Sequence, residues 1–299
     1  MKCVLSIISI LFWTELKAQP IPDTTYRAPI KNAYYNNEHS SVVCIDEAHF
    51  NFHTAIGGYM PFAQVLRDDG CLIERGTELF SHDYLNHFDV MVVSNALHFD
   101  NFNRWTLPTP SAFNHEEIDE INHWVLEGGS LLLIADHMPF AGAAADLARS
   151  FGFTFYNGFA MDMKNTKTHD EFRTADQSLN TSWISAKDSD ILLPDSVATF
   201  TGQAFDCPKE AIRILTLPKN YVLKLPEVAW EFQHQTMVLD ASGKSQGAIL
   251  EYGKGRVAVF GEAAMFTAQM AGNSRVGMNT PFGSENYRLL LHVMHWLKK

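Results

Sequence analysis

Four short, uninterrupted apolar runs constrain the fold of this chain more than any other feature. They lie at residues 41–45, 71–73, 90–93 and 131–134. A strand that is apolar at every position, rather than at alternate positions, is typical of a parallel sheet covered on both faces. The sequence therefore predicts an α/β fold built on a mostly parallel sheet.

Between and after these runs, apolar residues recur at helical spacing. The helices expected from this spacing lie at 61–69, 114–127, 141–151 and 285–297. Asn114 and Glu117 form a capping-box pair at the start of the second helix. Apolar runs at 247–252 and 257–260, joined by a glycine turn, predict a hairpin. This alternation predicts helices on both faces of the sheet.

The pattern changes in the middle of the chain, where short strand-like runs alternate with Asp, Asn, Pro and Thr. We expect a β-rich insertion of hairpins and long loops at about 153–240, because the sheet pattern resumes after it. The remainder reads as a single domain over 41–299, preceded by an extended lead-in at 19–40 that is rich in proline and asparagine.

The first 18 residues resemble a secretory signal peptide. A basic start is followed by an apolar run from Val4 to Trp13 and by a small residue, Ala18. The run is too short to span a bilayer, which takes about 20 residues. We therefore expect cleavage after Ala18, export to a periplasm or beyond, and no membrane span.

Charge and composition exclude several classes of protein. The formal net charge is −11, and a chain this acidic lacks the basic surface that nucleic acid requires. The three cysteines outside the apolar leader are Cys44, Cys71 and Cys207, an odd number without zinc-ligand spacing, and none is a convincing nucleophile. A dinucleotide fingerprint is absent, so we expect no cofactor.

Polar side chains gather just after the predicted strands. They are Asp46, His49, Asn51 and His53 after the first run, Asn95 and His98 after the third, Asp136 and His137 after the fourth, and Glu262 and Gln269 after the hairpin. Because ligands bind outside the carboxyl ends of parallel strands, we expect these groups to share one pocket. His49 and His53 would share a face if helical, which leaves a metal pair open, although we expect no metal site.

Several of these segments resemble an uncharacterised family of exported amidotransferase-like domains. They are 46–53, 133–140, 200–205, 261–269 and 277–279, and the resemblance covers about 40–299. The broader similarity is to the class I glutamine amidotransferase fold, which implies a flavodoxin-like sheet. The family's nucleophilic cysteine is replaced here by the turn Ala135-Asp136-His137, so glutamine hydrolysis by a thiolate is not expected.

The resemblance also implies a biological setting. Similar domains occur with unsaturated-uronyl hydrolases in polysaccharide-degrading systems, where a dehydratase acts on uronate-terminated oligosaccharides such as those from ulvan. The resemblance thus implies a carbon–oxygen lyase that eliminates water from the non-reducing-end uronate of an oligosaccharide. The sequence leaves the oligomeric state open.

The residues suit such a reaction, which needs a base, an acid and stabilisation of enolate-like charge. The candidate catalytic residues are His137, Asp136, Glu262 and His49. The candidate substrate-binding residues are Asn51, His53, Asn95, His98, Gln203 and Gln269. We expect Asp136 to fix the tautomer of His137 or raise its basicity. We expect His49, His53 or His98 to be the second acid or base or, in charged form, to hold the substrate carboxylate.

Two alternatives remain. Asp136 and Glu262 would also suit a glycoside hydrolase, which usually places two carboxylates beside the scissile bond. The chain would otherwise be a non-catalytic module that binds sugar or a partner, since fold alone does not decide function. A buried, strongly perturbed His137 or Glu262 in a deep cleft favours catalysis, whereas a shallow aromatic groove favours binding.

Overall fold

The computed structural model describes residues 20–35, 40–164, 167–185 and 190–298. The predicted signal peptide, 1–18, lies outside the described residues. Five parallel strands form the centre of the fold: β2 (Val42–Asp46), β3 (Leu72–Gly76), β4 (Val90–Ser94), β5 (Ser130–Ile134) and β15 (Gly255–Phe260). Their order in the sheet is β3-β2-β4-β5-β15, which is the flavodoxin-like order.

The fold class predicted from the apolar runs is therefore confirmed. In β5 all five residues are buried, as expected for a strand covered on both sides. Val43 and Ile45 of β2 pack into one hydrophobic cluster, whereas Cys44 between them packs into the other. Successive side chains of a strand point to opposite faces, so a continuous apolar run supplies both cores at once.

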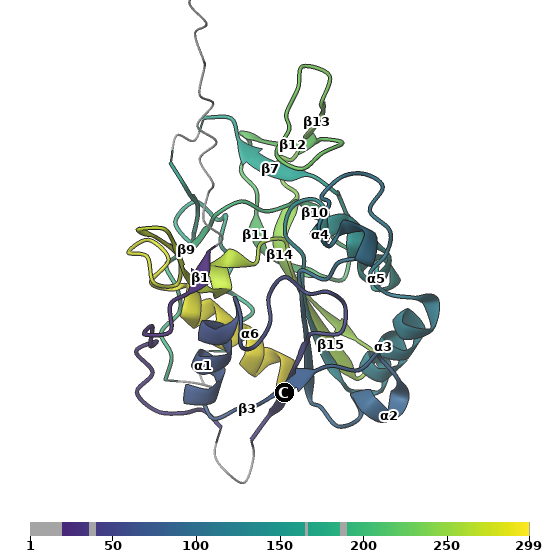
Figure 1. The fold of residues 1–299 in the computed structure, drawn as a ribbon. Coiled ribbons are helices and arrows are strands. Elements are labelled where there is room, and N and C mark those ends of the chain that lie inside the picture. Colours follow the sequence, from purple (N-terminus) through teal and green to yellow (C-terminus); the bar gives the residue numbers. More distant parts are fainter. Residues whose placement is uncertain (1–19, 36–39, 165–166, 186–189, 299) are drawn as a thin grey trace, which may run out of the picture.

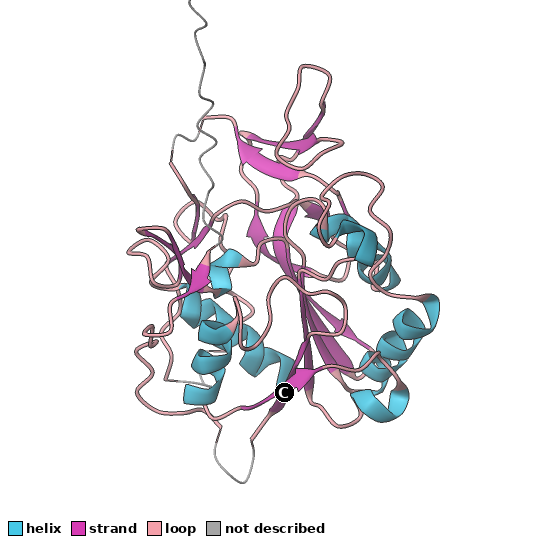
Figure 2. Cartoon of the chain, viewed as in Figure 1, coloured by secondary structure: helices cyan, strands magenta, loops and turns pink. Residues whose placement is uncertain are grey.

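Helices cover both faces of this sheet (Figures 1 and 2). They are α1 (Met60–Asp68), α2 (His82–Leu85), α3 (His115–Glu127), α4 (Phe140–Ala143), α5 (Ala145–Ser150) and α6 (Asn286–Lys298). Helices α1 and α6 pack on the face of Val43, and α2, α3 and α5 pack on the face of Cys44. None of the described helices is long and apolar enough to cross a bilayer.

Antiparallel strands extend the sheet beyond β15. They are β14 (Ser245–Tyr252), β11 (Ile212–Thr216), β10 (Phe205–Asp206) and β6 (Thr154–Phe155). Three of these come from the segment 153–240, which was predicted to be a β-rich insertion of hairpins and long loops. They pair with β14 or with one another, and so cover the edge that β14 would otherwise expose.

The other described strands form small sheets: β1 (Ile21–Pro22) with β16 (Ala268–Ala271) and β17 (Ser274–Gly277), β7 (Phe159–Asp162) with β12 (Tyr221–Leu225) and β13 (Met237–Asp240), and β8 (Asp170–Arg173) with β9 (Ser196–Thr199). The β7-β12-β13 sheet lies at the top of Figure 1, beyond the carboxyl ends of the parallel strands. The insertion thus supplies a cover for the edge at which the polar residues gather.

Two predicted boundaries differ from the structure. The helix expected at 141–151 is split into α4 and α5 at Ala144. Helix α4 is held by a residue outside it, because the Asn157 side chain accepts a hydrogen bond from the Gly142 N–H at 3.0 Å. Strand β3 runs on to Gly76 rather than ending at residue 73, since it pairs with β2 along its whole length.

The capping box of α3 is formed as predicted. The Asn114 side chain accepts from the Glu117 N–H at 2.9 Å, and the Glu117 carboxylate accepts from the Asn114 N–H at 3.2 Å. These bonds satisfy two backbone donors that the first turn of a helix leaves without partners.

We predict that Asn114→Ala lowers the free energy of unfolding by about 1 kcal/mol, because a backbone donor of the first turn loses its acceptor. Urea unfolding followed by circular dichroism measures the change. The control is Asp119→Ala on the exposed side of the same helix, which should have a much smaller effect. Equal destabilisation by both variants would contradict the capping role.

Candidate active site

A cavity of about 390 Å³ lies at the carboxyl ends of the parallel strands. This volume falls in the range of small-molecule sites. Its polar lining comprises His53, Asn95, Asp136, His137, Thr201, Glu262 and Gln269. Its aromatic lining comprises Phe52, Trp105, Phe140, Phe200 and Trp230. Six of the ten predicted site residues therefore meet in one cavity.

Asp136 and Glu262 form a buried acidic pair. Asp136 follows β5 and Glu262 follows β15, neighbouring parallel strands whose ends lie side by side. Burial raises the pKa of Asp136, partly offset by His137 and by backbone N–H donors. Burial also raises the pKa of Glu262 well above its usual value, and the Asp136 charge raises it further. Glu262 therefore keeps its proton to a higher pH than an ordinary glutamic acid, next to a second carboxyl group.

Backbone donors fix both carboxyl groups. The Glu262 oxygens accept from the N–H groups of Ala264 at 3.0 Å and Met265 at 2.7 Å, at the start of the 3₁₀ turn η2 (Ala264–Phe266). An Asp136 oxygen accepts from the His137 N–H at 2.9 Å. The backbone N–H groups that follow β5 and β15 therefore fix the positions of the two carboxyl groups.

His137 presents one ring nitrogen to the cavity. Its Nδ1 lies 2.7 Å from the carbonyl oxygen of Met138, which can only accept, so Nδ1 carries the proton of the neutral ring. The lone pair then lies on Nε2. The prediction that Asp136 fixes this tautomer is wrong, because the Asp136 carboxylate bonds to the His137 backbone and the Met138 carbonyl fixes the ring.

Aromatic rings hold the imidazole of His137 in place. It stacks on Phe159 of β7 with centroids 4.5 Å apart and planes 12° apart. Trp230 meets it edge-on at 4.7 Å, and Trp105 and Phe140 lie near 6 Å. The insertion therefore completes the pocket of a residue that belongs to the central sheet.

Asn95 and Gln269 also line the cavity. The Asn95 side chain accepts from the Asp136 N–H at 2.9 Å, which joins the ends of β4 and β5. The Asn95 backbone is in the left-handed region at φ 48°, which asparagine tolerates better than most residues. Asn95 thus positions Asp136, in addition to any contact with a ligand.

His53 is part of the cavity wall but is not a cation. Complete burial lowers its pKa to about 3, so the ring is neutral at physiological pH. It stacks on Tyr59 at 4.7 Å, and a Cβ on Gly58 would collide with its Nδ1, which makes glycine necessary there. The expectation that a charged His53 holds a substrate carboxylate is therefore wrong.

His49 and Asn51 lie outside the cavity and have structural contacts. His49 Nδ1 lies 2.9 Å from Asp46, and its Nε2 lies 2.8 Å from Glu117. The Asn51 amide donates to Asp46 at 3.0 Å. With both ring nitrogens bound to buried carboxylates, His49 has no atom left for a substrate, so its predicted catalytic role is not supported by the structure.

His98 and Gln203 also lie outside the cavity. His98 is half-buried and accepts from the Asp100 N–H at 3.2 Å, at the start of the 3₁₀ turn η1 (Phe99–Asn101). Gln203 is fully buried and donates to the carbonyl of Ala135 at 2.9 Å. Gln203 therefore supports the residue before Asp136 rather than a sugar hydroxyl.

The metal pair that the sequence left open is not formed. Residues 47–53 are not helical, so His49 and His53 do not share a face. Within the described parts of the chain, no three His, Cys, Asp or Glu side chains form a metal-binding cluster.

Burial raises the pKa of Cys44 to about 12, which leaves that thiol unreactive.

Two tryptophans of the site, Trp105 and Trp230, were not singled out by sequence reasoning. Both lie in loops next to charged residues. A large aromatic side chain in such a loop does not serve the packing of a helix or strand. Trp230 also has a φ of 70°, a strained value for a non-glycine residue. An aromatic residue in a polar loop is the sequence signal that would have found them.

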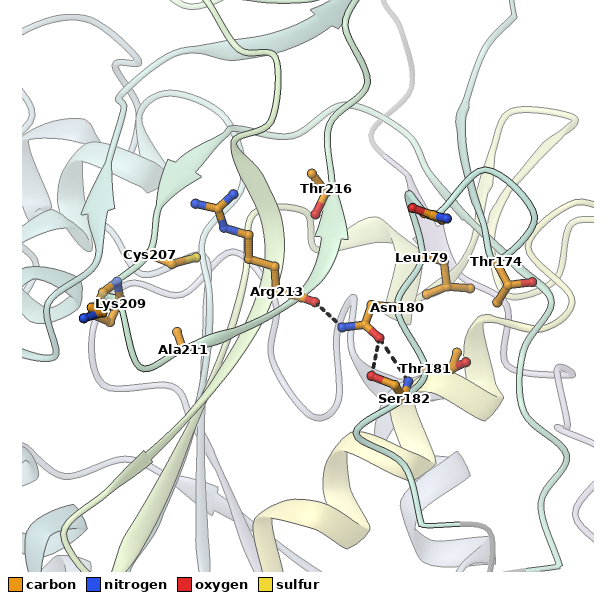
Figure 3. A pocket seen from close by; sticks show the side chains of 12 residues that line it. Thr174, Leu179, Asn180, Thr181, Ser182, Cys207, Lys209, Ala211, Arg213 and Thr216 are labelled. Atoms are coloured by element: carbon orange, nitrogen blue, oxygen red, sulfur yellow. Dashed lines mark hydrogen bonds between the residues drawn. The ribbon is translucent and has the colours of Figure 1, made fainter.

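A larger open depression, of about 870 Å³, lies on the insertion (Figure 3). Several of its polar side chains are bound to the protein itself: Asn180 donates to the Arg213 carbonyl at 3.0 Å and accepts from Ser182. The Arg213 guanidinium donates to the Gly243 carbonyl. It contains no predicted site residue, and we place the active site in the smaller cavity, where buried acids and an imidazole converge.

No protein-family model matches the chain, and no curated protein matches it by sequence. Its fold does match solved structures. The mmIFT52 N-terminal domain matches with a TM-score of 0.58 and 12% identity, over 87% of this chain and 98% of that domain. A putative ThuA-like protein from Bacteroides uniformis gives 0.45 and 11%, over 90% and 93%. At such identities the first match shows a shared fold alone.

We predict that stability falls as pH rises from 6.5 through about 9. Desolvation lowers the pKa of His49, but Asp46 and Glu117 outweigh it and raise the value to about 9. A group whose pKa is raised on folding stabilises below its unfolded value of 6.5, and loses that contribution as it deprotonates. The loss is on the order of 3 kcal/mol.

Urea unfolding across this pH range measures the effect. His49→Gln should be less stable than the wild type at pH 6.5 and should show a smaller decline. His123→Gln, an exposed histidine on α3, is the matched control and should keep it. A decline of the same size in His49→Gln would show that another group is responsible.

Proposed function

We propose that the cavity binds the end of an oligosaccharide and catalyses proton transfer on it, as a dehydratase of uronate-ended oligosaccharides of the ulvan type. One observation carries the proposal. His137, whose Nε2 has no partner among the described residues, lines an aromatic cavity together with Glu262, an acid whose pKa is raised by burial. A base and an acid with separate environments are what an elimination needs.

The roles follow from the hydrogen bond of His137 Nδ1 and from the raised pKa of Glu262. His137 takes the C5 proton of the uronate through Nε2, and the electrons of that C–H bond form the C4–C5 double bond. The C4–O bond breaks, and the leaving hydroxyl takes the proton of Glu262 and departs as water. After this step His137 carries the proton and Glu262 is ionised, and exchange of protons with solvent restores both groups.

The substrate carboxylate needs neutral partners in this cavity. The described lining contains no lysine or arginine. The hydrogen-bond donors available are the side-chain amides of Gln269 and Asn95, which would stabilise enolate-like charge without an ion pair. The raised pKa of Glu262 supports this reading, because an ionised Glu262 would repel the uronate.

Glycoside hydrolysis is the second candidate, and the same acid pair favours it. An acid with a raised pKa beside a carboxylate is the arrangement that many glycosidases use. In that reaction Glu262 would protonate the glycosidic oxygen and Asp136 would act as the base or nucleophile. His137 would then have no necessary role in the chemistry.

Family membership and location complete the proposal. We infer that the chain belongs with the exported amidotransferase-like domains that its segments resemble, and that it acts outside the cytoplasm. The flavodoxin-like strand order supports the first inference. The second rests on residues 1–18 alone.

Mass spectrometry of uronate-ended oligosaccharides incubated with the protein tests the reaction class. We expect each product to be lighter than its substrate by the mass of one water, with the chain length preserved. Products of shorter chain length that together gain one water would replace the dehydratase with the hydrolase. Unchanged oligosaccharides that nevertheless bind would identify a non-catalytic module.

We predict that His137→Gln lowers kcat by about 10²–10⁴-fold, the range expected for loss of a general base. Glutamine fills much of the same space among the aromatic rings, so the unfolding midpoint should stay near that of the wild type. His98→Gln, outside the cavity, is the matched control. Full activity of His137→Gln would favour the hydrolase, and a collapsed melting curve would identify a structural residue.

We predict that Glu262→Gln also abolishes turnover, because glutamine resembles the neutral acid but has no proton to give. A raised folded pKa means that wild-type stability decreases as pH rises above 4.5, where the unfolded carboxyl ionises. The variant should therefore gain stability relative to the wild type between pH 4.5 and neutrality. Retained activity, or a stability difference independent of pH, would contradict the assigned protonation state.

A further inference from the structure

Exposed phenyl rings gather beside the mouth of the cavity. Phe50, Phe99 and Phe102 are exposed by 43%, 68% and 50%. The Phe50 ring lies 5.7 Å from that of Phe99 and 5.6 Å from that of Phe102, so the three form one patch, called here the phenyl platform. A soluble protein rarely exposes grouped aromatic rings without a binding role.

The backbone holds this platform in a costly arrangement. Phe50 has a φ of 47°, in the left-handed region that bulky residues avoid. Strain of this kind, of order 1–3 kcal/mol, persists where the surroundings impose it and concentrates at binding sites. Burial does not explain it, because the ring that it positions remains exposed.

The loop that carries the other two rings is held rigidly. The buried Asn101 side chain donates to the carbonyls of Arg104 at 3.0 Å, Thr106 at 3.0 Å and Pro108 at 3.3 Å. Preorganised rings cost little entropy when a ligand binds to them.

The platform is continuous with the cavity. Phe52, two residues after Phe50, lines the cavity and contacts Trp105 at 5.9 Å. Trp105 also lines the cavity. Its neighbours Arg104 and Thr106, together with Phe99, line another depression, of about 420 Å³, called here the second depression. A chain leaving the cavity past Trp105 therefore meets the phenyl platform.

A cation lies next to the rings. Arg104 is exposed in the second depression and takes part in none of the ion pairs of the described residues. Asp100, the carboxylate of this depression, lies 3.5 Å from His98. Arg104 is thus available to an acid group, in contrast to the cavity, whose described lining has no lysine or arginine.

We propose that the phenyl platform and Arg104 bind the second and later sugars of an acidic oligosaccharide whose end occupies the cavity. The inference rests on the proposed function for the cavity, and it adds which residues hold the part of the oligosaccharide that lies outside the cavity. The faces of sugar rings pack on the phenyl rings, and Arg104 pairs with a carboxylate or sulfate of the chain.

Isothermal titration of the inactive His137→Gln protein with uronate-ended di-, tetra- and hexasaccharides tests the platform. Affinity should rise from the disaccharide to the tetrasaccharide. Phe99→Ala/Phe102→Ala in this background should reduce that gain by about tenfold, which corresponds to roughly 1.4 kcal/mol of binding free energy. Leu79→Ala, which removes an exposed apolar side chain elsewhere, is the matched control. Equal affinity for all lengths, or an unchanged gain in the double variant, would overturn the proposal.

Arg104→Gln tests the charge. It should weaken binding of the acidic tetrasaccharide and leave binding of its carboxyl-reduced, neutral analogue the same. Equal effects on both sugars would remove Arg104 from the proposal.

Turnover separates this proposal from the proposed function. If no oligosaccharide loses water but affinity still rises with chain length, the platform stands and the dehydratase fails. If water is lost at equal efficiency from every length, the dehydratase stands and the platform fails.

Discussion

Burial of carboxyl groups is the constraint on which this structure depends. Asp46 and Glu117 lie near the carboxyl edge of the sheet and share His49, a cation that offsets their desolvation. At the same edge His137 and hydrogen-bond donors only partly offset the desolvation of Asp136, and Glu262 has backbone N–H donors but no cationic partner. A buried carboxyl group with a cationic partner keeps its charge, whereas one without such a partner holds its proton to a higher pH. The same edge therefore holds two clusters: one around His49, which has only structural contacts, and one of Asp136, His137 and Glu262, which lines the cavity.

The insertion turns this edge into an enclosed site. Without Phe159 and Trp230, both from the insertion, the His137 ring would lie open to solvent above the sheet. Aromatic walls exclude water and so raise the pKa of the acids beneath them, which links packing directly to chemistry. Asn95 and Trp230, which line the cavity, and Phe50, two residues from the lining residue Phe52, have positive φ values. Such strain persists where the surrounding structure fixes the position of a side chain.

Much of the fold was predictable, and the reason is local. Continuous apolar runs specify parallel strands, and the Asn114–Glu117 pair specifies the start of α3, since both signals act over a few residues. The convergence of Asp136, His137 and Glu262 followed from a general rule about strand ends. The fate of His49 did not follow, because its partner Glu117 is 68 residues away and sequence gives no measure of that approach. Trp230 entered the site in the same way, through a loop folded back over the sheet.

The sequence by itself determined the sheet, its helices and the edge at which polar groups collect, because each depends on patterns repeated every two to four residues. Only the tertiary structure decided which of those polar groups are reactive. His49 and His137 both follow parallel strands of this sheet, and nothing in their neighbouring residues distinguishes them. Two carboxylates occupy both nitrogens of the first ring, whereas one carbonyl and four aromatic rings leave a nitrogen of the second open to the cavity. The reactivity of a side chain is set by what long-range folding places around it.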